Sequence, residues 1–256
     1  MRRGLYGVMP ILESVDWSGP ALSLLSHCNE LDPCRPAIMH VRHTERTSLE
    51  HGGASGDDML STSSGIAAAT EFGARLPIDR RYRLYHTYVQ RARETAGAIR
   101  DGIVSRGGSA EIVEVVPFKY SIDRVAVNRY LNKVRERCRS EDETSVGFTN
   151  DWLAGLVTPP SCILPSYDFA RNVADYTLKK FDSATADTID IYVSHDTYVG
   201  SVMFHWFGVP VHKDGIDFLD GFLLQQGDKG MVVWFRNKRL VLDYPHWWSH
   251  SRSHNR

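Results

Sequence analysis

Two arginines and a histidine stand together where a short apolar run ends. The run at residues 38–41 is followed by Arg42 and His43, and Arg46 comes three positions later. An apolar run that ends in charge is typical of a buried strand whose end delivers side chains to a crevice. Guanidinium groups are planar charged forks that suit phosphate oxygens, and an imidazole between them can act as a nucleophile toward phosphorus. The spacing therefore indicates phosphoryl chemistry.

Two further clusters stand at similar positions in the chain. Arg91 opens a helical pattern, and His195 and Asp196 follow the strand-like run at residues 188–193. In open α/β sheets, catalytic groups gather at the carboxyl ends of strands, and helix N-termini attract anions. We therefore expect these residues at the same kind of structural position as His43, although spacing alone does not bring the clusters together.

Several segments, in the same order, resemble the motifs of the histidine phosphatase superfamily, whose fold is phosphoglycerate mutase-like. They are residues 42–46 (RHTER), 60–72 (LSTSSGIAAATEF), 89–96 (VQRARETA), 193–197 (VSHDT) and 219–222 (LDGF). A single Arg-His pair is weak evidence, but ordered motifs that extend over roughly residues 36–243 are a specific signal.

The resemblance implies a role for each matching residue. His43 would be the nucleophile that forms a phosphohistidine, and Arg42, Arg46 and Arg91 would bind the phosphoryl oxygens together with His195. This assignment agrees with the chemistry, because phosphoryl transfer depends mainly on positioning and on neutralising the equatorial oxygens.

The resemblance also implies that Asp196 protonates the leaving group and then activates water. Smaller members of the family often take this acid from a Glu after the third strand, and Glu114 is the alternative here. The His-Asp pair and Arg46 resemble the acid phosphatase and phytase branch, but the chain is short for that branch and has few cysteines. A proton donor of this kind typically contributes about 10²–10⁴-fold in rate.

Thr44 departs from the family pattern, which usually has Gly after the nucleophilic histidine. Glycine allows a close backbone approach. We therefore expect Thr44 to narrow the pocket or to shift the loop.

Strand and helix patterns alternate along the chain, which favours an α/β fold. We expect a three-layer α/β/α sandwich around one mostly parallel sheet, with a helical cap insertion. The expected strands are residues 37–41, 84–87, 111–116, 188–193, 218–224, 231–235 and 240–242. The expected helices are residues 21–31, 64–76, 91–104, 127–134, 150–156, 169–176 and 199–207. The expected parts are an N-terminal extension (1–35), a histidine phosphatase-like domain (36–245) with a cap at about 117–187, and a polar tail (246–256).

The composition excludes some classes of function. Thirty basic and 31 acidic residues give a net charge of −1, so nothing favours nonspecific binding to nucleic acid or to an anionic membrane. The four cysteines lack CxxC spacing and are expected to be free thiols in a reducing compartment, although a Cys28–Cys34 disulfide is sterically conceivable. With no signal-peptide pattern and no long apolar run, the expected location is the cytoplasm.

Several residues have ordinary structural interpretations. His40 is expected to be a packed residue, and Lys119 and Tyr120 are expected to be ordinary loop residues. The alternative to phosphate binding by Arg46 is a salt bridge to Glu45 or Glu50. No metal site is expected, because the spacing of the histidines and Asp196 does not match a known metal motif.

The sequence thus predicts a metal-independent, cofactor-free phosphomonoesterase that uses a phosphohistidine and acts on a small phosphorylated metabolite. Two alternatives stay open: a phosphoglycerate mutase-type phosphoryl transferase, and a catalytically weak phosphate-binding regulatory module. The sequence does not identify the substrate or the oligomeric state.

Overall fold

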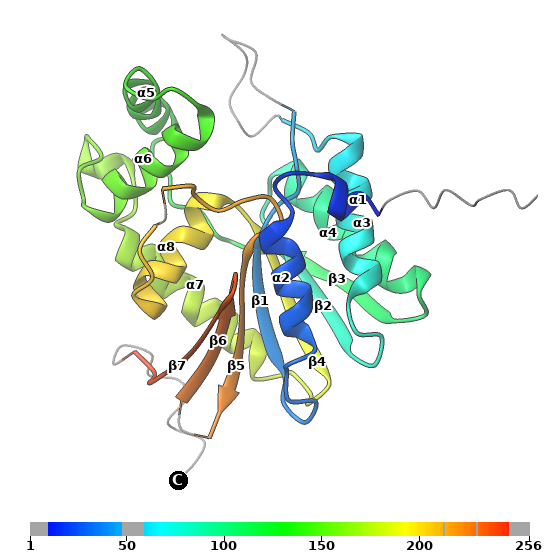
Figure 1. Cartoon of the computed structure of the whole chain (residues 1–256). Coiled ribbons are helices and arrows are strands. Elements are labelled where there is room, and N and C mark those ends of the chain that lie inside the picture. Colours follow the sequence, from blue (N-terminus) through cyan, green and yellow to red (C-terminus); the bar gives the residue numbers. More distant parts are fainter. Residues whose placement is uncertain (1–9, 48–58, 212, 229, 246–256) are drawn as a thin grey trace, which may run out of the picture.

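A computed structural model describes residues 10–47, 59–211, 213–228 and 230–245. Within these residues one seven-stranded sheet has the order β3-β2-β4-β1-β5-β6-β7 (Figure 1). The strands are β1 (Ala37–Arg42), β2 (Arg81–His86), β3 (Ser109–Val115), β4 (Thr188–Ser194), β5 (Gly221–Gly227), β6 (Gly230–Phe235) and β7 (Lys238–Leu242). Strands β1 to β4 are parallel to one another, whereas β5 pairs antiparallel with β1 and continues into an antiparallel β5-β6-β7 meander. The predicted α/β/α sandwich is confirmed.

Helices cover both faces of this sheet. They are α1 (Ile11–Ser14), α2 (Gly19–Cys28), α3 (Ser63–Arg75), α4 (Gln90–Ser105), α5 (Arg124–Arg135), α6 (Glu141–Leu153), the short 3-10 helix η2 (Pro160–Cys162), α7 (Ser166–Phe181) and α8 (Asp196–Phe207). Figure 1 shows α1 to α4 on one side of the sheet and α7 and α8 on the other. No helix among the described residues is long and apolar enough to cross a membrane.

Strand β1 shows how the sequence produces these layers. Successive side chains of a strand point to opposite faces. Met39 and Val41 therefore pack in the core beneath α2, α3 and α4, while Ile38 packs in the core beneath α7 and α8. His40 shares the second face, where it stacks between Tyr192 and Phe222. The prediction that His40 is a packed residue is confirmed, since it is only 2% exposed.

Residues 10–35, the described part of the expected extension, pack in the sandwich rather than beside it. Leu12 and Leu24 are fully buried in the same core as Met39 of β1. The periodicity of residues 21–31 indicated a helix, but not that its apolar side covers the central strand. The expected tail at residues 246–256 lies outside the described residues.

A cap made of α5, α6 and the segments around them, residues 117–165, lies beyond one end of the sheet (Figure 1). Helix α6 is longer than the expected helix at residues 150–156. It starts after Ser140, whose hydroxyl accepts a hydrogen bond from the N–H of Glu143, and three acidic residues occupy its first turn. Such residues stabilise a helix N-terminus. Helix α7 lies within the expected cap range, but its residues Phe169 and Val173 pack in the core beside Ile38 of the sheet.

Candidate active site

Strand register brings the two histidine motifs together. Strands β1 and β4 are parallel neighbours in which Arg42 pairs with Ser194, so His43 and His195 leave the sheet side by side. The N–H of His43 donates to the carbonyl of Ser194 at 2.9 Å. Strand β2 is the other neighbour of β4, and His86 pairs with Val193. The chain after β2 therefore reaches the same edge and starts α4, which carries Arg91.

Gly221, the first residue of β5, allows β5 to pack closely against β1. Gly221 pairs with Val41, and a Cβ at Gly221 would lie 1.8 Å from the carbonyl oxygen of His40. Only glycine allows such a close backbone approach. The preceding Asp220 forms an ion pair with Arg236, and its carbonyl accepts a hydrogen bond from the N–H of Arg42 at 2.9 Å. The segment at 219–222 thus supports the end of β1 and does not line the cavity described below.

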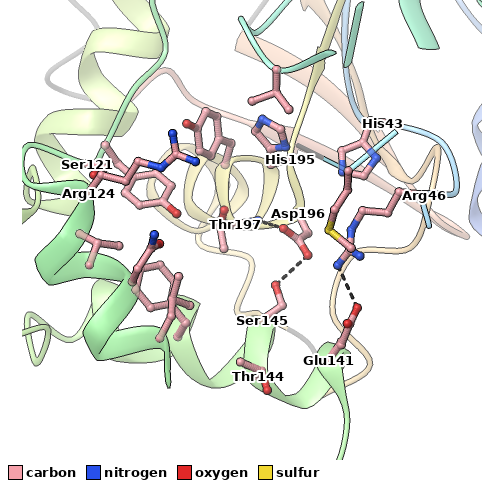
Figure 2. Close-up of a pocket in the computed structure, with 18 of the residues that line it drawn as sticks. His43, Arg46, Ser121, Arg124, Glu141, Thr144, Ser145, His195, Asp196 and Thr197 are labelled. Carbon is pink, nitrogen blue, oxygen red and sulfur yellow. Dashed lines mark hydrogen bonds and ion pairs between the residues drawn. The ribbon is translucent and has the colours of Figure 1, made fainter. Parts of the chain in front are cut away.

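A cavity of about 590 Å³ opens between the strand ends and the cap (Figure 2). Six residues that the sequence singled out line it together: Arg42, His43, Arg46, Arg91, His195 and Asp196. Glu114, the alternative acid, is not a lining residue; its carboxylate pairs with Lys180 at 2.5 Å and accepts a hydrogen bond from Tyr176. Of the two candidate acids, Asp196 therefore lies beside the histidines and Glu114 does not.

His43 is held in one tautomer. Its Nδ1 lies 2.7 Å from the carbonyl oxygen of Thr44, which can only accept a hydrogen bond, so the proton is on Nδ1. Burial, followed by the positive charge of Arg91, holds the pKa of His43 well below its usual value. The ring is therefore neutral near pH 7, and Nε2 carries no proton.

Arg91 connects the two histidines. Its Nε donates to Nε2 of His43 at 2.8 Å, and its Nη2 lies 3.3 Å from Nδ1 of His195. Arg91 stands in the first turn of α4, where the helix dipole also favours an anion. A phosphoryl group bound at this helix end would take over the guanidinium hydrogen bonds and release the lone pair of His43.

His195 is neutral as well. Burial, with the nearby charge of Arg91, lowers its pKa to about 3. Because Arg91 can only donate to Nδ1, the ring proton lies on Nε2 and is donated to the hydroxyl of Thr87 at 3.1 Å. The rings of His43 and His195 lie 5.5 Å apart between centroids.

Asp196 begins α8 and is held by three groups. Arg42 lies 3.5 Å from Oδ2, the hydroxyl of Ser145 donates to Oδ2 at 2.7 Å, and the N–H of Thr197 donates to Oδ1 at 2.8 Å. Loss of hydration by itself would raise the pKa of Asp196, but Arg42, Ser145 and Thr197 outweigh that effect and lower it to about 2. The carboxyl group is ionised in the ligand-free protein.

The two arginines of the first motif are fixed differently. Arg42 is buried; its Nη1 donates to the carbonyl of Ile216 and its guanidinium lies over the ring of Phe218 at 4.2 Å. Nε of Arg42 is buried and has no hydrogen-bond partner within the described part of the chain. Arg46 pairs with Glu141 of the cap at 3.0 Å (Figure 2), and the carboxylate of Glu45 accepts from Thr62 and Ser64 instead. Glu50, the other expected partner, lies outside the described residues.

Thr44 does not narrow the cavity. Its side chain is fully buried and donates to the carbonyl of Gly65 in α3 at 2.8 Å, and it is not a lining residue. The N–H of Thr44 donates to the hydroxyl of Thr95 in α4 at 3.0 Å. The expectation of a narrower pocket is wrong, because the side chain points to the neighbouring helices and anchors the loop there.

A cap was expected, but its individual residues at the site were not, and neither was Thr87. Ser145 and Glu141 come from α6, a helix whose beginning was not expected, and no motif marks either residue. Thr87 could have been found, because it stands directly after β2. Lys119 and Tyr120, interpreted as ordinary loop residues, both line the cavity.

No protein-family model matches the sequence, and no curated protein sequence matches it. Solved structures do match the fold. A protein from Escherichia coli, described as a proposed α-ribazole-5′-P phosphatase, covers 81% of this chain and 98% of its own, with 16% identity and a TM-score of 0.51. YhfR from Bacillus stearothermophilus covers 83% and 99%, also with 16% identity and a TM-score of 0.51. Mycobacterial hydrolase 1 covers 81% and 99%, with 12% identity and a TM-score of 0.51.

The chain has the phosphoglycerate mutase-like fold. The fold that the resemblance implies is therefore confirmed. These matches extend over nearly the whole of the other chains and over 81–83% of this one. At such low identity the likeness says nothing about the reaction, which has to be argued from the residues.

Proposed function

We propose that the protein is a metal-independent phosphomonoester hydrolase that works through a phosphohistidine at His43. The observation that carries this proposal is the state of His43: a neutral, buried imidazole with its proton fixed on Nδ1 and its Nε2 facing Arg91 in a cationic cavity. A neutral lone pair beside fixed positive charges meets the two needs of phosphoryl transfer, a nucleophile and neutralised oxygens.

The first step forms a bond from Nε2 of His43 to phosphorus and breaks the bond from phosphorus to the ester oxygen. The leaving alkoxide takes a proton from Asp196. In the second step water attacks the phosphohistidine and gives a proton to the Asp196 carboxylate, which releases phosphate and restores His43. Arg42, Arg46 and Arg91 balance the phosphoryl charge, and His195 lies beside the same group.

The low pKa of Asp196 suits the second step, which requires a base, and opposes the first, which requires an acid. Substrate binding changes this balance. A phosphoryl dianion that draws Arg42 toward its own oxygens weakens the contact that holds the carboxyl group ionised, and its negative charge raises the pKa of Asp196. Asp196 thus becomes a proton donor only when the substrate is in place.

The size of the cavity and the description of one matching structure support a small substrate. A space of about 590 Å³ is in the range of sites for small molecules. The matching protein from Escherichia coli is described as a proposed α-ribazole-5′-P phosphatase.

The decisive experiment follows release of phosphate from para-nitrophenyl phosphate and from glycerol 3-phosphate, with wild-type protein and His43→Ala. We expect hydrolysis by the wild type, a loss of at least about 10³-fold in the variant, and an acid-labile phosphoprotein in rapid-quench samples of the wild type only. Activity that survives in His43→Ala would overturn the mechanism. Phosphate binding without release by the wild type would instead identify a binding module, and transfer to a second hydroxyl rather than to water would identify a mutase.

The acid is tested with a matched pair of variants, Asp196→Asn and Glu114→Gln. para-Nitrophenolate leaves readily without a proton, whereas an alkoxide does not. We therefore expect Asp196→Asn to slow the release of glycerol from glycerol 3-phosphate far more than the release of para-nitrophenolate. Glu114→Gln should change neither rate by more than about twofold. The opposite pattern would assign the acid to Glu114.

A further inference from the structure

The loop that precedes β5, residues 215–220, supports Arg42 from outside the cavity. The carbonyl of Ile216 accepts a hydrogen bond from Nη1 of Arg42 at 2.5 Å, and the ring centroid of Phe218 lies 4.2 Å from the guanidinium carbon. The loop also holds the backbone of Arg42, because the N–H of Leu219 donates to its carbonyl at 3.2 Å. None of these loop residues, all of them described, lines the cavity. The position of Arg42 therefore depends on a segment that the substrate does not reach.

Arg236, in the turn between β6 and β7, closes this loop. Its Nη2 donates to the carbonyl of Gly215 at 2.6 Å and to Oδ2 of Asp220 at 3.0 Å, and its Nε donates to the same oxygen at 3.2 Å. One guanidinium thus joins the first and the last residue of the 215–220 loop. Arg236 does not line the cavity, so any effect on the reaction is indirect.

Asp217 and Asp220 place negative charge near Arg42. Asp220 is 1% exposed, and its carboxylate accepts from the N–H groups of Gly221 at 2.7 Å and of Asp217 at 3.4 Å. Burial, followed by the charge of Asp220, raises the pKa of Asp217, whereas Arg236 and Arg42 lower it. Burial also raises the pKa of Asp220, and Arg236 opposes that effect. Without its counter-ion, such a carboxylate would compete with a phosphoryl group for the guanidinium of Arg42.

The backbone of this unit is strained at two residues. Arg236 has a φ of 47° and Leu219 a φ of 56°, and they are the non-glycine residues with positive φ in the described part of the chain. Glycine and asparagine adopt this conformation more easily than arginine or leucine. The carbonyl of Arg236 is held by the hydroxyl of Ser23 and by Nε2 of His27 in α2, the latter at 2.6 Å. Strain of this kind persists where the surroundings enforce it, and it gathers at functional sites.

We propose, on the basis of the proposed function, that Arg236 is a positioning residue for phosphoryl binding. It holds the 215–220 loop against Arg42. It also balances Asp217 and Asp220, so that these carboxylates do not draw the guanidinium of Arg42 away from the phosphoryl group. Arg236 touches neither the substrate nor the reacting atoms, and its effect passes through Arg42.

The variants Arg236→Gln and Arg236→Lys test this role with para-nitrophenyl phosphate. Gln removes the charge, and we expect kcat/KM to fall about tenfold or more, mainly through a higher KM, because hydrogen bonds to a charged group are of that strength. Lys keeps the charge but not the planar fork, and its KM should lie between those of Gln and the wild type. Lys238→Gln, an exposed cation that ends the same turn, is the matched control and should change KM by less than about twofold.

The split between KM and kcat separates positioning from stability. A variant that is merely less stable loses kcat and keeps KM. A wild-type KM in Arg236→Gln would therefore overturn the proposal. If Arg236→Gln does not fold, Arg236→Lys decides in its place, because it leaves a counter-ion for Asp220, and a wild-type KM in that variant would overturn the proposal as well.

A double-mutant cycle with Arg42→Gln tests the route of the effect. If Arg236 acts through Arg42, adding Arg236→Gln to Arg42→Gln should change kcat/KM by less than about twofold, whereas independent effects multiply. Multiplied effects would overturn the proposal.

Calorimetric binding of inorganic phosphate separates the failure of this role from the failure of the proposed function. The Kd should rise about tenfold in Arg236→Gln and stay unchanged in Lys238→Gln. An unchanged Kd in Arg236→Gln would overturn the positioning role and leave hydrolysis through His43 untouched. A wild type that binds phosphate but releases none from an ester would instead overturn the proposed function, while the rise in Kd would still support the role of Arg236.

Discussion

The hydroxyl of Ser145 in the cap donates a hydrogen bond of 2.7 Å to Oδ2 of Asp196 at the start of α8 (Figure 2). This contact joins two parts of the chain that are 51 residues apart, and it ends on the group that we propose to move the proton. The position of the cap and the acidity of Asp196 are therefore coupled. A change in the cap is expected to change the pH dependence of catalysis as well as the choice of substrate.

We expect Ser145→Ala to raise the pKa of Asp196. The hydroxyl stabilises the ionised carboxylate, and its loss favours the protonated form. Because water activation requires the carboxylate, the acidic limb of the pH–rate profile should move to higher pH. The measurement is kcat for para-nitrophenyl phosphate over about pH 3 to 8. Ser145→Thr keeps a hydroxyl and should restore the profile; an unchanged acidic limb in Ser145→Ala would contradict the coupling.

Arg91→Gln tests the electrostatic control of His43. Burial lowers the pKa of His43 most, and the charge of Arg91 lowers it further. Removal of that charge should raise the pKa partway toward its usual value, and kcat/KM should fall by about 10²–10³-fold because a fixed donor to the phosphoryl group is lost. NMR titration of the ring measures the first effect. Arg93→Gln is the matched control, since Arg93 is exposed on the same helix; equal effects of the two variants would refute the role of Arg91.

Glu141→Gln is expected to strengthen substrate binding. Glu141 pairs with Arg46 at 3.0 Å and places a negative charge at an anion site. Its removal should lower KM for para-nitrophenyl phosphate by about two- to tenfold with little change in kcat. The melting temperature should hardly change, because a partly exposed ion pair contributes about 0–1 kcal/mol. Asp142→Asn, an exposed neighbour in the same turn, serves as control; a raised KM in Glu141→Gln would show that the pair instead positions Arg46.

Gly102→Ala should destabilise the support of the site. Helices α3 and α4 meet so closely that a Cβ at Gly102 would lie 2.0 Å from the carbonyl oxygen of Thr70. Overpacking of this kind costs about 1–3 kcal/mol or more in the free energy of unfolding, which urea denaturation would measure. Gly97→Ala in the same helix meets nothing within 4 Å and should be neutral or stabilising by up to about 1 kcal/mol. Equal stabilities would show that the two helices can move apart without cost.

Local patterns predicted the elements that carry the chemistry. Strand β1 and strand β4 are apolar runs that end in a histidine, and Arg91 stands at the beginning of an amphipathic helix. Period, length and end signals are properties of short segments, so they can be read from the chain without the fold. The ordered motifs added the expectation that these segments share one site, and the fold agrees with it.

The parts that were missed depend on distant contacts. The N-terminal segment was expected to be an extension, because its periodicity gives a helix but not the surface that the helix covers. The length of helix α6 was underestimated, because its apolar residues form only a weak stripe. Its start depends on Ser140, whose hydroxyl accepts a hydrogen bond at the helix N-terminus. The effect of Thr44 was misjudged, because the direction of its side chain is set by Gly65 of another helix.

The sequence by itself determined which residues could take part in phosphoryl transfer: the histidines, the arginines and Asp196, each placed by its type and by the end of a local element. Only the tertiary structure decided their protonation states and which residues lie beside them. The parallel register of β1 and β4 puts His43 beside His195, burial makes both neutral, and Ser145 reaches Asp196 from the cap. The reason is physical: residue type and local pattern are properties of the chain, whereas desolvation and charge–charge contact arise only when distant segments exclude water together.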